Sequence, residues 1–170
     1  YRRVIREDEK DNDSVLVRTE VLNNITGGLV DTLITYPEAL VEKVVDQKVL
    51  MDMSMRVHQG ESLSISFIEN LLIEYNFVRT DFVYEPGQFS IRGSIVDVYS
   101  FAEGLPIRID FFGDEIESIR FFDVETQLSD KRVESASIVP DLSHLTTTVS
   151  EQRTDIFSYF KEQPEWWIKN

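Results

Sequence analysis

Residues 88–122, QFSIRGSIVDVYSFAEGLPIRIDFFGDEIESIRFF, decide the fold of this chain. Apolar and polar residues alternate along most of the stretch, which is typical of strands that bury one face. Turn residues at Pro86-Gly87 and Gly113-Asp114 predict that consecutive strands run antiparallel. The stretch therefore predicts a small, curved antiparallel sheet.

The clearest helical pattern comes just before these strands. Between Ser64 and Tyr75 the apolar residues fall on one helical face, and Ser66-x-x-Glu69 forms a capping-box pattern near the start. One amphipathic helix packed on an antiparallel sheet gives an α+β fold.

The flanks of the sheet are predicted to be α/β fragments. We expect a helix from Ser14 to Ile25, a buried strand from Leu29 to Thr35 and a helix from Pro37 to Val45. Alternation over residues 48–60 predicts a strand, and Ser150 to Phe160 is predicted to be helical. The first dozen residues are mostly charged and are expected to form a solvated run.

The composition disfavours several classes of function. The chain has 170 residues with 17 Lys and Arg against 31 Asp and Glu, and its net charge of −14 disfavours nucleic-acid binding by the surface as a whole. It has no cysteine, and His58 lies far from His144, so we expect no metal site. No apolar run reaches membrane-spanning length, and we expect a monomeric cytoplasmic protein that was cut from a longer chain, because it begins at Tyr1.

Patterns for catalysis are absent or weak. No G-x-x-x-x-G-K-[ST] run is present, so we expect no ATP hydrolysis and no cofactor. The carboxylates of Asp110, Asp114, Glu115 and Glu117 could serve a metal-dependent hydrolase, which is one alternative function. Hairpins of acidic proteins commonly display solvated carboxylates, so we predict that the chain is not an enzyme.

The strand Ile107–Phe112 carries the residues that stand out. Its two-residue period puts Arg108 and Phe112 on the face opposite to the core. An exposed phenylalanine beside an arginine is typical of protein-binding hot spots. The alternative is that Phe112 packs against the turn that follows it.

The preceding strand adds a third candidate. Arg92 comes just before Gly93, a glycine that we expect to bend or bulge the strand, with Asp97 pointing outward beyond it. In a consecutive hairpin order Arg92 would share the outer face with Arg108 and Phe112. A small basic and aromatic patch on an acidic protein favours an acidic protein partner.

The run from Tyr84 to Ser129 resembles a segment of bacterial transcription-repair coupling factors that is shared with the excision-repair subunit UvrB. The resemblance rests on R-G, then D-[VIL]-[YF], then R-[IL]-[DE]-F-F-G-D-E-I, then F-D-x-x-[TS]-Q, and it extends over about Ser14 to Pro140. Gln127 in place of the glycine common in UvrB, together with TYPEALVEKVV at residues 35–45, favours the coupling factors; UvrB itself remains the alternative.

This resemblance implies a non-catalytic module that binds UvrA and recruits it in transcription-coupled nucleotide excision repair. Residues 49–140 would form the UvrA-binding domain, and residues 1–48 and 141–170 would be parts of a degenerate UvrB-like domain. The positions that match the family's UvrA contacts are Arg92, Arg108 and Phe112.

The resemblance also implies properties of the full-length protein. It would be an ATP-dependent DNA translocase that binds RNA polymerase and DNA through domains absent from this chain. A distant C-terminal domain would mask the UvrA-binding surface, so this chain alone would be constitutively open.

Overall fold

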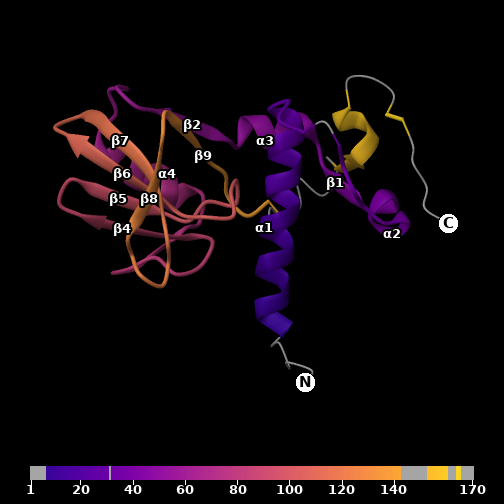
Figure 1. Ribbon diagram of the computed structural model, residues 1–170, viewed down its shortest axis with the longest axis horizontal. Helices are drawn as coiled ribbons and strands as arrows, with labels where there is room; N and C mark the ends of the chain where they lie inside the picture. Colours follow the sequence, from indigo (N-terminus) through magenta and orange to yellow (C-terminus); the bar gives the residue numbers. More distant parts are fainter. Residues whose placement is uncertain (1–6, 31, 143–152, 161–163, 166–170) are drawn as a thin grey trace.

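A computed structural model describes residues 7–30, 32–142, 153–160 and 164–165, with the backbone alone for residues 7–14. A sheet-rich part and a smaller, mainly helical part lie on either side of the long helix α1 (Glu7–Thr26), as Figure 1 shows. The elements after α1 are α2 (Pro37–Val41), β1 (Lys43–Val45), α3 (Gln47–Asp52), β2 (Met55–His58), α4 (Ile65–Glu74), β3 (Val78–Arg79), β4 (Gln88–Arg92), β5 (Ile95–Val98), β6 (Ile107–Phe112), β7 (Glu115–Phe122), β8 (Ser129–Val133), β9 (Ser135–Ile138), β10 (Arg153–Asp155) and the 3₁₀ helix η1 (Ile156–Tyr159).

The main sheet has six strands in the order β3-β4-β5-β6-β7-β8. Neighbouring strands are antiparallel, except that β3 runs parallel to β4. Two further antiparallel pairs, β1 with β10 and β2 with β9, lie outside this sheet. The α+β prediction is confirmed, and the sheet is antiparallel apart from its short edge strand β3.

Two tight hairpins join strands of the main sheet, β4 to β5 and β6 to β7. Gly93 has φ +61° and Gly113 has φ +64°, and each is the first residue of a two-residue loop, where glycine adopts this conformation without steric cost. The expectation that Gly93 bends one continuous strand is therefore wrong. The chain reverses there, and Arg92 pairs with Ile95.

Helix α4 packs on one face of the sheet, as predicted. Its buried residues Ile68 and Leu72 join a cluster with Phe89, Val96 and Ile109. The helix begins earlier than the predicted capping box, because the Ser64 hydroxyl accepts a hydrogen bond from the Phe67 amide at 3.1 Å.

The flanks depart from the sequence predictions. The predicted helix Ser14–Ile25 lies inside α1, which already includes the charged residues from Glu7 onward. The described residues of 29–35 contain no strand, and Pro37 begins a helix that ends at Val41 instead of Val45. Residues 48–60 form helix α3 and strand β2 in place of one strand.

Tertiary pairing explains the largest of these departures. Val44 in β1 lies opposite Thr154 in β10, so two short segments that are distant in sequence become strands together. The expected helix Ser150–Phe160 is replaced by β10 and η1, and its residues 150–152 lie outside the described part of the chain.

A second apolar cluster holds the smaller part together. Leu22 of α1 is buried there, whereas Leu16 of the same helix belongs to the cluster under the sheet. The Tyr159 hydroxyl donates to the Val45 carbonyl at 2.7 Å, and burial raises the pKa of Tyr159. No helix in the described ranges is long and apolar enough to cross a membrane.

Candidate protein-binding face

The face of the sheet opposite α4, here called the outer face, carries polar side chains in rows that run across the strands. The strand registers place one residue of each strand from β4 to β8 side by side in the longest row. Its members are Ser90, Asp97, Arg108, Arg120 and Arg132. Three arginines on neighbouring strands thus lie side by side, and Arg108, the first of them, lies next to Asp97.

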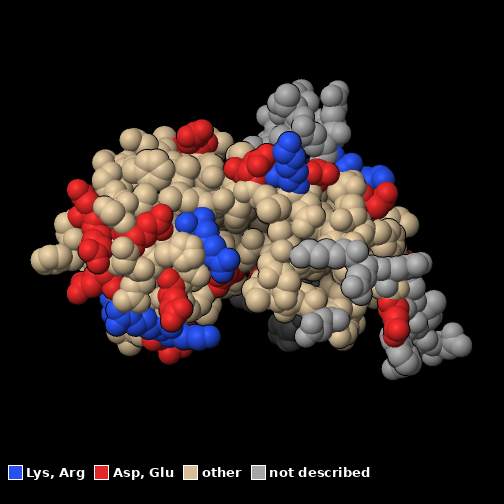
Figure 2. Space-filling view, turned by 90° about the horizontal axis from the view of Figure 1, so that it is seen from above, with Lys and Arg blue, Asp and Glu red and all other residues tan. Residues whose placement is uncertain are grey.

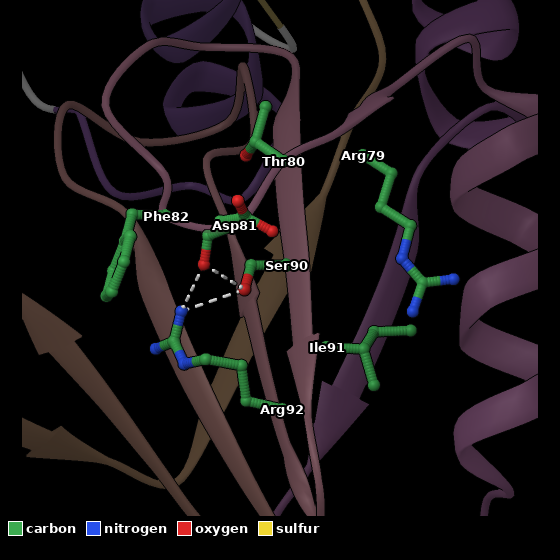
Figure 3. Close-up of a pocket in the computed structure, with 7 residues that line it drawn as sticks. All are labelled: Arg79, Thr80, Asp81, Phe82, Ser90, Ile91 and Arg92. Atoms are coloured by element: carbon green, nitrogen blue, oxygen red, sulfur yellow. Dashed lines mark hydrogen bonds between the residues drawn. The ribbon is translucent and has the colours of Figure 1, made fainter.

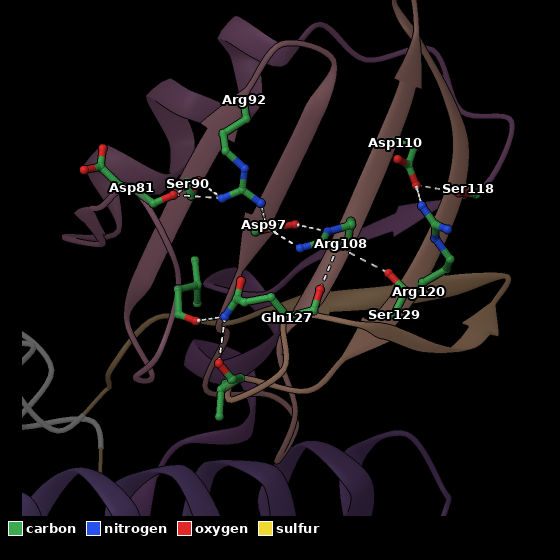
Figure 4. Close-up of polar contacts among 12 residues, drawn as sticks. Asp81, Ser90, Arg92, Asp97, Arg108, Asp110, Ser118, Arg120, Gln127 and Ser129 are labelled. Atoms are coloured by element: carbon green, nitrogen blue, oxygen red, sulfur yellow. Dashed lines mark hydrogen bonds and ion pairs between the residues drawn. The ribbon is translucent and has the colours of Figure 1, made fainter.

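Asp97 is the centre of this face. Its carboxylate accepts hydrogen bonds from Nη2 of Arg92 at 2.6 Å and from Nε and Nη2 of Arg108 at 2.7 and 2.9 Å (Figure 4). Asp97 lies on the outer face as expected, but it is fully buried instead of pointing into solvent. A buried carboxylate that is bonded by two arginines fixes the guanidinium groups in one arrangement.

Asp97 is not among the site residues predicted from the sequence. The signal that could have revealed it is the cross-strand position of one acid between two arginine-bearing strands.

Arg108 is almost entirely engaged inside the protein. Its side chain is 14% exposed, its Nη1 donates to the Gln127 carbonyl at 3.2 Å, and its guanidinium lies 4.7 Å from the centre of the Phe122 ring. The hydrogen bond with Asp97 raises the pKa of Arg108. Arg108 thus links β5, β6 and the loop before β8.

Arg92 is more accessible than Arg108. Its side chain is 35% exposed, and Nη1 donates to the Asp81 carbonyl and to the Ser90 hydroxyl, each at 2.8 Å. Its guanidinium lies 4.9 Å from the centre of the Phe82 ring. Part of the Arg92 head group therefore remains available to a partner.

Phe112 lies apart from the arginines. It is 81% exposed beside the β6–β7 hairpin turn and opposite Glu115, so the alternative that it packs against the turn is wrong. It lies four positions along β6 from Arg108, a distance of roughly 13 Å. The structure thus brings Arg92 and Arg108 together on Asp97, whereas Phe112 shares their face but lies apart from them.

Gln127 closes the outer face from the loop before β8. It has φ +59°, which is uncommon for a residue with a side chain, and its amide donates to the carbonyls of Val83 at 3.2 Å and Val124 at 2.8 Å. These bonds tie the segment around Val83, itself fully buried, over the outer face. The two loops together explain the burial of Asp97.

The acidic hairpin does not form a metal-binding arrangement. Asp110 accepts a hydrogen bond from the Ser118 hydroxyl at 2.8 Å and forms an ion pair with Arg120 (Figure 4). Within the part of the chain that the structure describes, no group of three His, Cys, Asp or Glu side chains could hold a metal ion. Acidic side chains gather at the end of the sheet that lies farthest from α1, on the left in Figure 2, and basic side chains form smaller groups.

Comparison with known proteins matches more than half of this chain. The family model described as UvrB interaction domain matches residues 55–144, which include all three predicted site residues. The transcription-repair-coupling factor of Bacillus subtilis (strain 168) is 31% identical over 123 residues, which cover 72% of this chain and 10% of that protein.

Other curated relatives carry the same name. The transcription-repair-coupling factor of Staphylococcus aureus (strain USA300) is 37% identical over 111 residues, or 65% of this chain and 9% of that protein. That of Escherichia coli (strain K12) is 32% identical over 108 residues, or 64% of this chain and 9% of that protein. The chain thus spans about a tenth of the length of the curated relatives it matches.

Proposed function

We propose that this chain, which belongs to the UvrB interaction domain family, is the UvrA-binding module of a transcription-repair-coupling factor. In this role it recruits UvrA during transcription-coupled nucleotide excision repair and catalyses no reaction itself. RNA polymerase and DNA are partners of the complete cytoplasmic protein, an ATP-dependent translocase, through other domains. The alternative assignment to UvrB is less well supported, because the relatives described above are coupling factors.

The single observation that carries this proposal is the outer face with its fixed arginines and free phenylalanine. Asp97 holds Arg92 and Arg108 in place, so little side-chain entropy is lost when a partner binds them. Arg92 supplies the accessible hydrogen-bond donor to acidic groups on UvrA. Arg108 helps to hold Arg92 in position through their shared partner Asp97, and the exposed part of its own side chain also binds UvrA. Phe112, with most of its surface in solvent, is the apolar anchor.

The flanks fit a shared unit beside the UvrA-binding domain of residues 49–140. Strand β1 lies within residues 1–48 and β10 within residues 141–170, and the two pair directly with each other. This pairing supports the proposal that both flanks are parts of one UvrB-like domain. In the complete protein a distant domain masks the outer face until UvrA is needed.

Calorimetry with purified UvrA tests the proposal. We expect Phe112→Ala to weaken binding by about 2 kcal/mol, near thirtyfold, because it removes the anchor. Phe67→Ala is the matched control, since Phe67 is also exposed but lies on α4, across the sheet. Unchanged affinity of the Phe112 variant, or equal losses in both variants, would contradict this placement of the site.

The arginines need a second comparison. We expect Arg92→Ala and Arg108→Ala each to cost about 2 kcal/mol or more in UvrA affinity. Arg79→Ala is the matched control, because Arg79 is 57% exposed and lies outside the Asp97 network. If correctly folded wild-type chain does not bind UvrA, the proposed function is wrong.

A further inference from the structure

The edge of the sheet at β4 is only partly covered. The Val78 amide donates to the Gly87 carbonyl and the Thr80 amide to the Phe89 carbonyl, both at 2.8 Å. Odd-numbered residues of β4 therefore direct their backbone groups toward β3. Strand β3 ends at Arg79, so in the described structure no strand pairs with β4 on this side at Ile91.

The chain leaves this edge abruptly after Thr80. The Asp81 carbonyl accepts hydrogen bonds from the Ser90 hydroxyl at 3.0 Å and from Nη1 of Arg92 at 2.8 Å, which hold the segment over the outer face. The departure opens a cavity of about 510 Å³, here called the β4 notch (Figure 3). The notch is lined by Arg79, Thr80, Asp81, Phe82, Ser90, Ile91 and Arg92.

We propose that the β4 notch binds an extended, carboxylate-bearing segment of a partner protein, which adds as a strand beside Ile91. An unpaired edge amide and carbonyl offer a backbone template, and strand addition satisfies both groups. Figure 3 shows Arg92 and Phe82 to one side of the β4 ribbon and Arg79 and Ile91 to the other. The segment thus meets a cationic side chain on either side of the β4 edge.

The charges at the notch favour an acidic segment. Arg79 pairs with Glu69 and Arg92 pairs with Asp97, but their side chains remain 57% and 35% exposed, so each guanidinium can bind a further carboxylate. Asp81 is the one acidic residue that lines the cavity. Guanidinium groups bind carboxylates through short, charge-assisted hydrogen bonds. A second copy of this chain is a poor occupant, because two chains that each carry a net charge of −14 repel each other.

The substitution Ile91→Pro tests selectively whether a partner strand adds beside β4. Proline lacks the amide hydrogen, and it is tolerated on edge strands where that hydrogen faces solvent, so the pairing of β4 with β5 stays intact. Ile91→Val is the matched control, since it keeps the amide and most of the apolar side chain. The probe is a display library of random short peptides, selected on the immobilised wild-type chain and then measured individually.

We expect the selected peptides to be rich in Asp and Glu and to lose about tenfold or more in affinity for Ile91→Pro, with little change for Ile91→Val. Arg79→Ala should reduce their affinity about fivefold. Failure to select any peptide, or equal binding by the proline and valine variants, would overturn the proposal.

Hydrogen exchange in the wild-type chain makes the test independent of how the variants fold. The Ile91 amide should exchange rapidly in the free chain and at least about tenfold more slowly with a selected peptide bound. Unchanged exchange with peptide bound, or wild-type self-association that Ile91→Pro abolishes, would also overturn the proposal. None of these measurements uses UvrA, so their outcome is separate from that of the proposed function.

Discussion

The two ends of strand β6 behave differently although they were predicted to form one patch. At one end Arg108 is 14% exposed and bonded to Asp97, Gln127 and Ser129; at the other, Phe112 is 81% exposed. The first end is part of the internal structure of the sheet, and the second is available to a partner. Loss of binding after mutation therefore has a different physical origin at each end.

A residue can therefore match a contact motif and still act mainly by stabilising the fold. Substituting Arg108 disturbs a buried carboxylate, whereas substituting Phe112 removes only exposed surface. Measuring stability beside affinity separates the two cases, and the following variants do so in order of decreasing expected effect.

Removal of the Asp97 carboxylate should have the largest effect on stability. Asp97→Ala should lower the free energy of unfolding by about 3–5 kcal/mol, because it leaves two arginines without their buried partner. Urea denaturation measures this loss. Asp97→Asn, which keeps a hydrogen-bond acceptor, should cost less. A loss below about 1 kcal/mol for the alanine variant would show that the network does not stabilise the fold.

Arg108→Ala should rank second, with a loss of about 2–4 kcal/mol in the same urea measurement. It leaves Asp97 buried with fewer hydrogen bonds and removes the guanidinium that lies on the Phe122 ring. Arg92→Ala should cost only about 1 kcal/mol, because the Arg92 side chain is more exposed and Arg108 still pairs with Asp97. The reverse order would contradict the account of Arg108 as the inner partner.

The side-chain bonds and the backbone conformation of Gln127 should both affect stability. Gln127→Ala should lower stability by about 1–2 kcal/mol, since the bonds to Val83 and Val124 are lost while φ stays positive. Gln127→Gly should recover about 0.5–1 kcal/mol relative to alanine, because glycine adopts positive φ freely. Thermal unfolding of the two variants side by side measures the difference, and equal midpoints would argue against strain at this position.

Phe112→Ala should have the smallest effect on stability, within about 0.5 kcal/mol of wild type. Its ring makes few contacts that unfolding would break. The same variant is expected to lose UvrA affinity, so stability and binding separate at this residue. A large drop in the urea midpoint would mean that Phe112 belongs to the structural end of β6 after all.

The sequence predicted the parts of the fold that local patterns encode. Helix α4, predicted from its apolar face, is confirmed. Strands β6 and β7, predicted on either side of the Gly113 turn, are confirmed as well. The placement of Arg108 and Phe112 on one face also follows from the two-residue period and is confirmed. Their roles in binding UvrA stay predictions.

Features that depend on distant segments could not be predicted. Strand β1 exists because β10 pairs with it, and Asp97 is buried because loops carrying Val83 and Gln127 cover the outer face. The reversal at Gly93 was missed for another reason. A glycine within an apolar alternation fits both a bulge and a tight hairpin, and only the pairing of Arg92 with Ile95 decides between them.

Helix α1 links the unfolding of the two halves of the molecule. It places Leu16 in the cluster under the sheet and Leu22 in the second cluster, less than two helical turns apart. Because one helix contributes to both clusters, opening one cluster removes support from the helix that the other cluster uses. The two halves should therefore melt in a single cooperative transition, and a nick or proline within α1 would divide that transition into two.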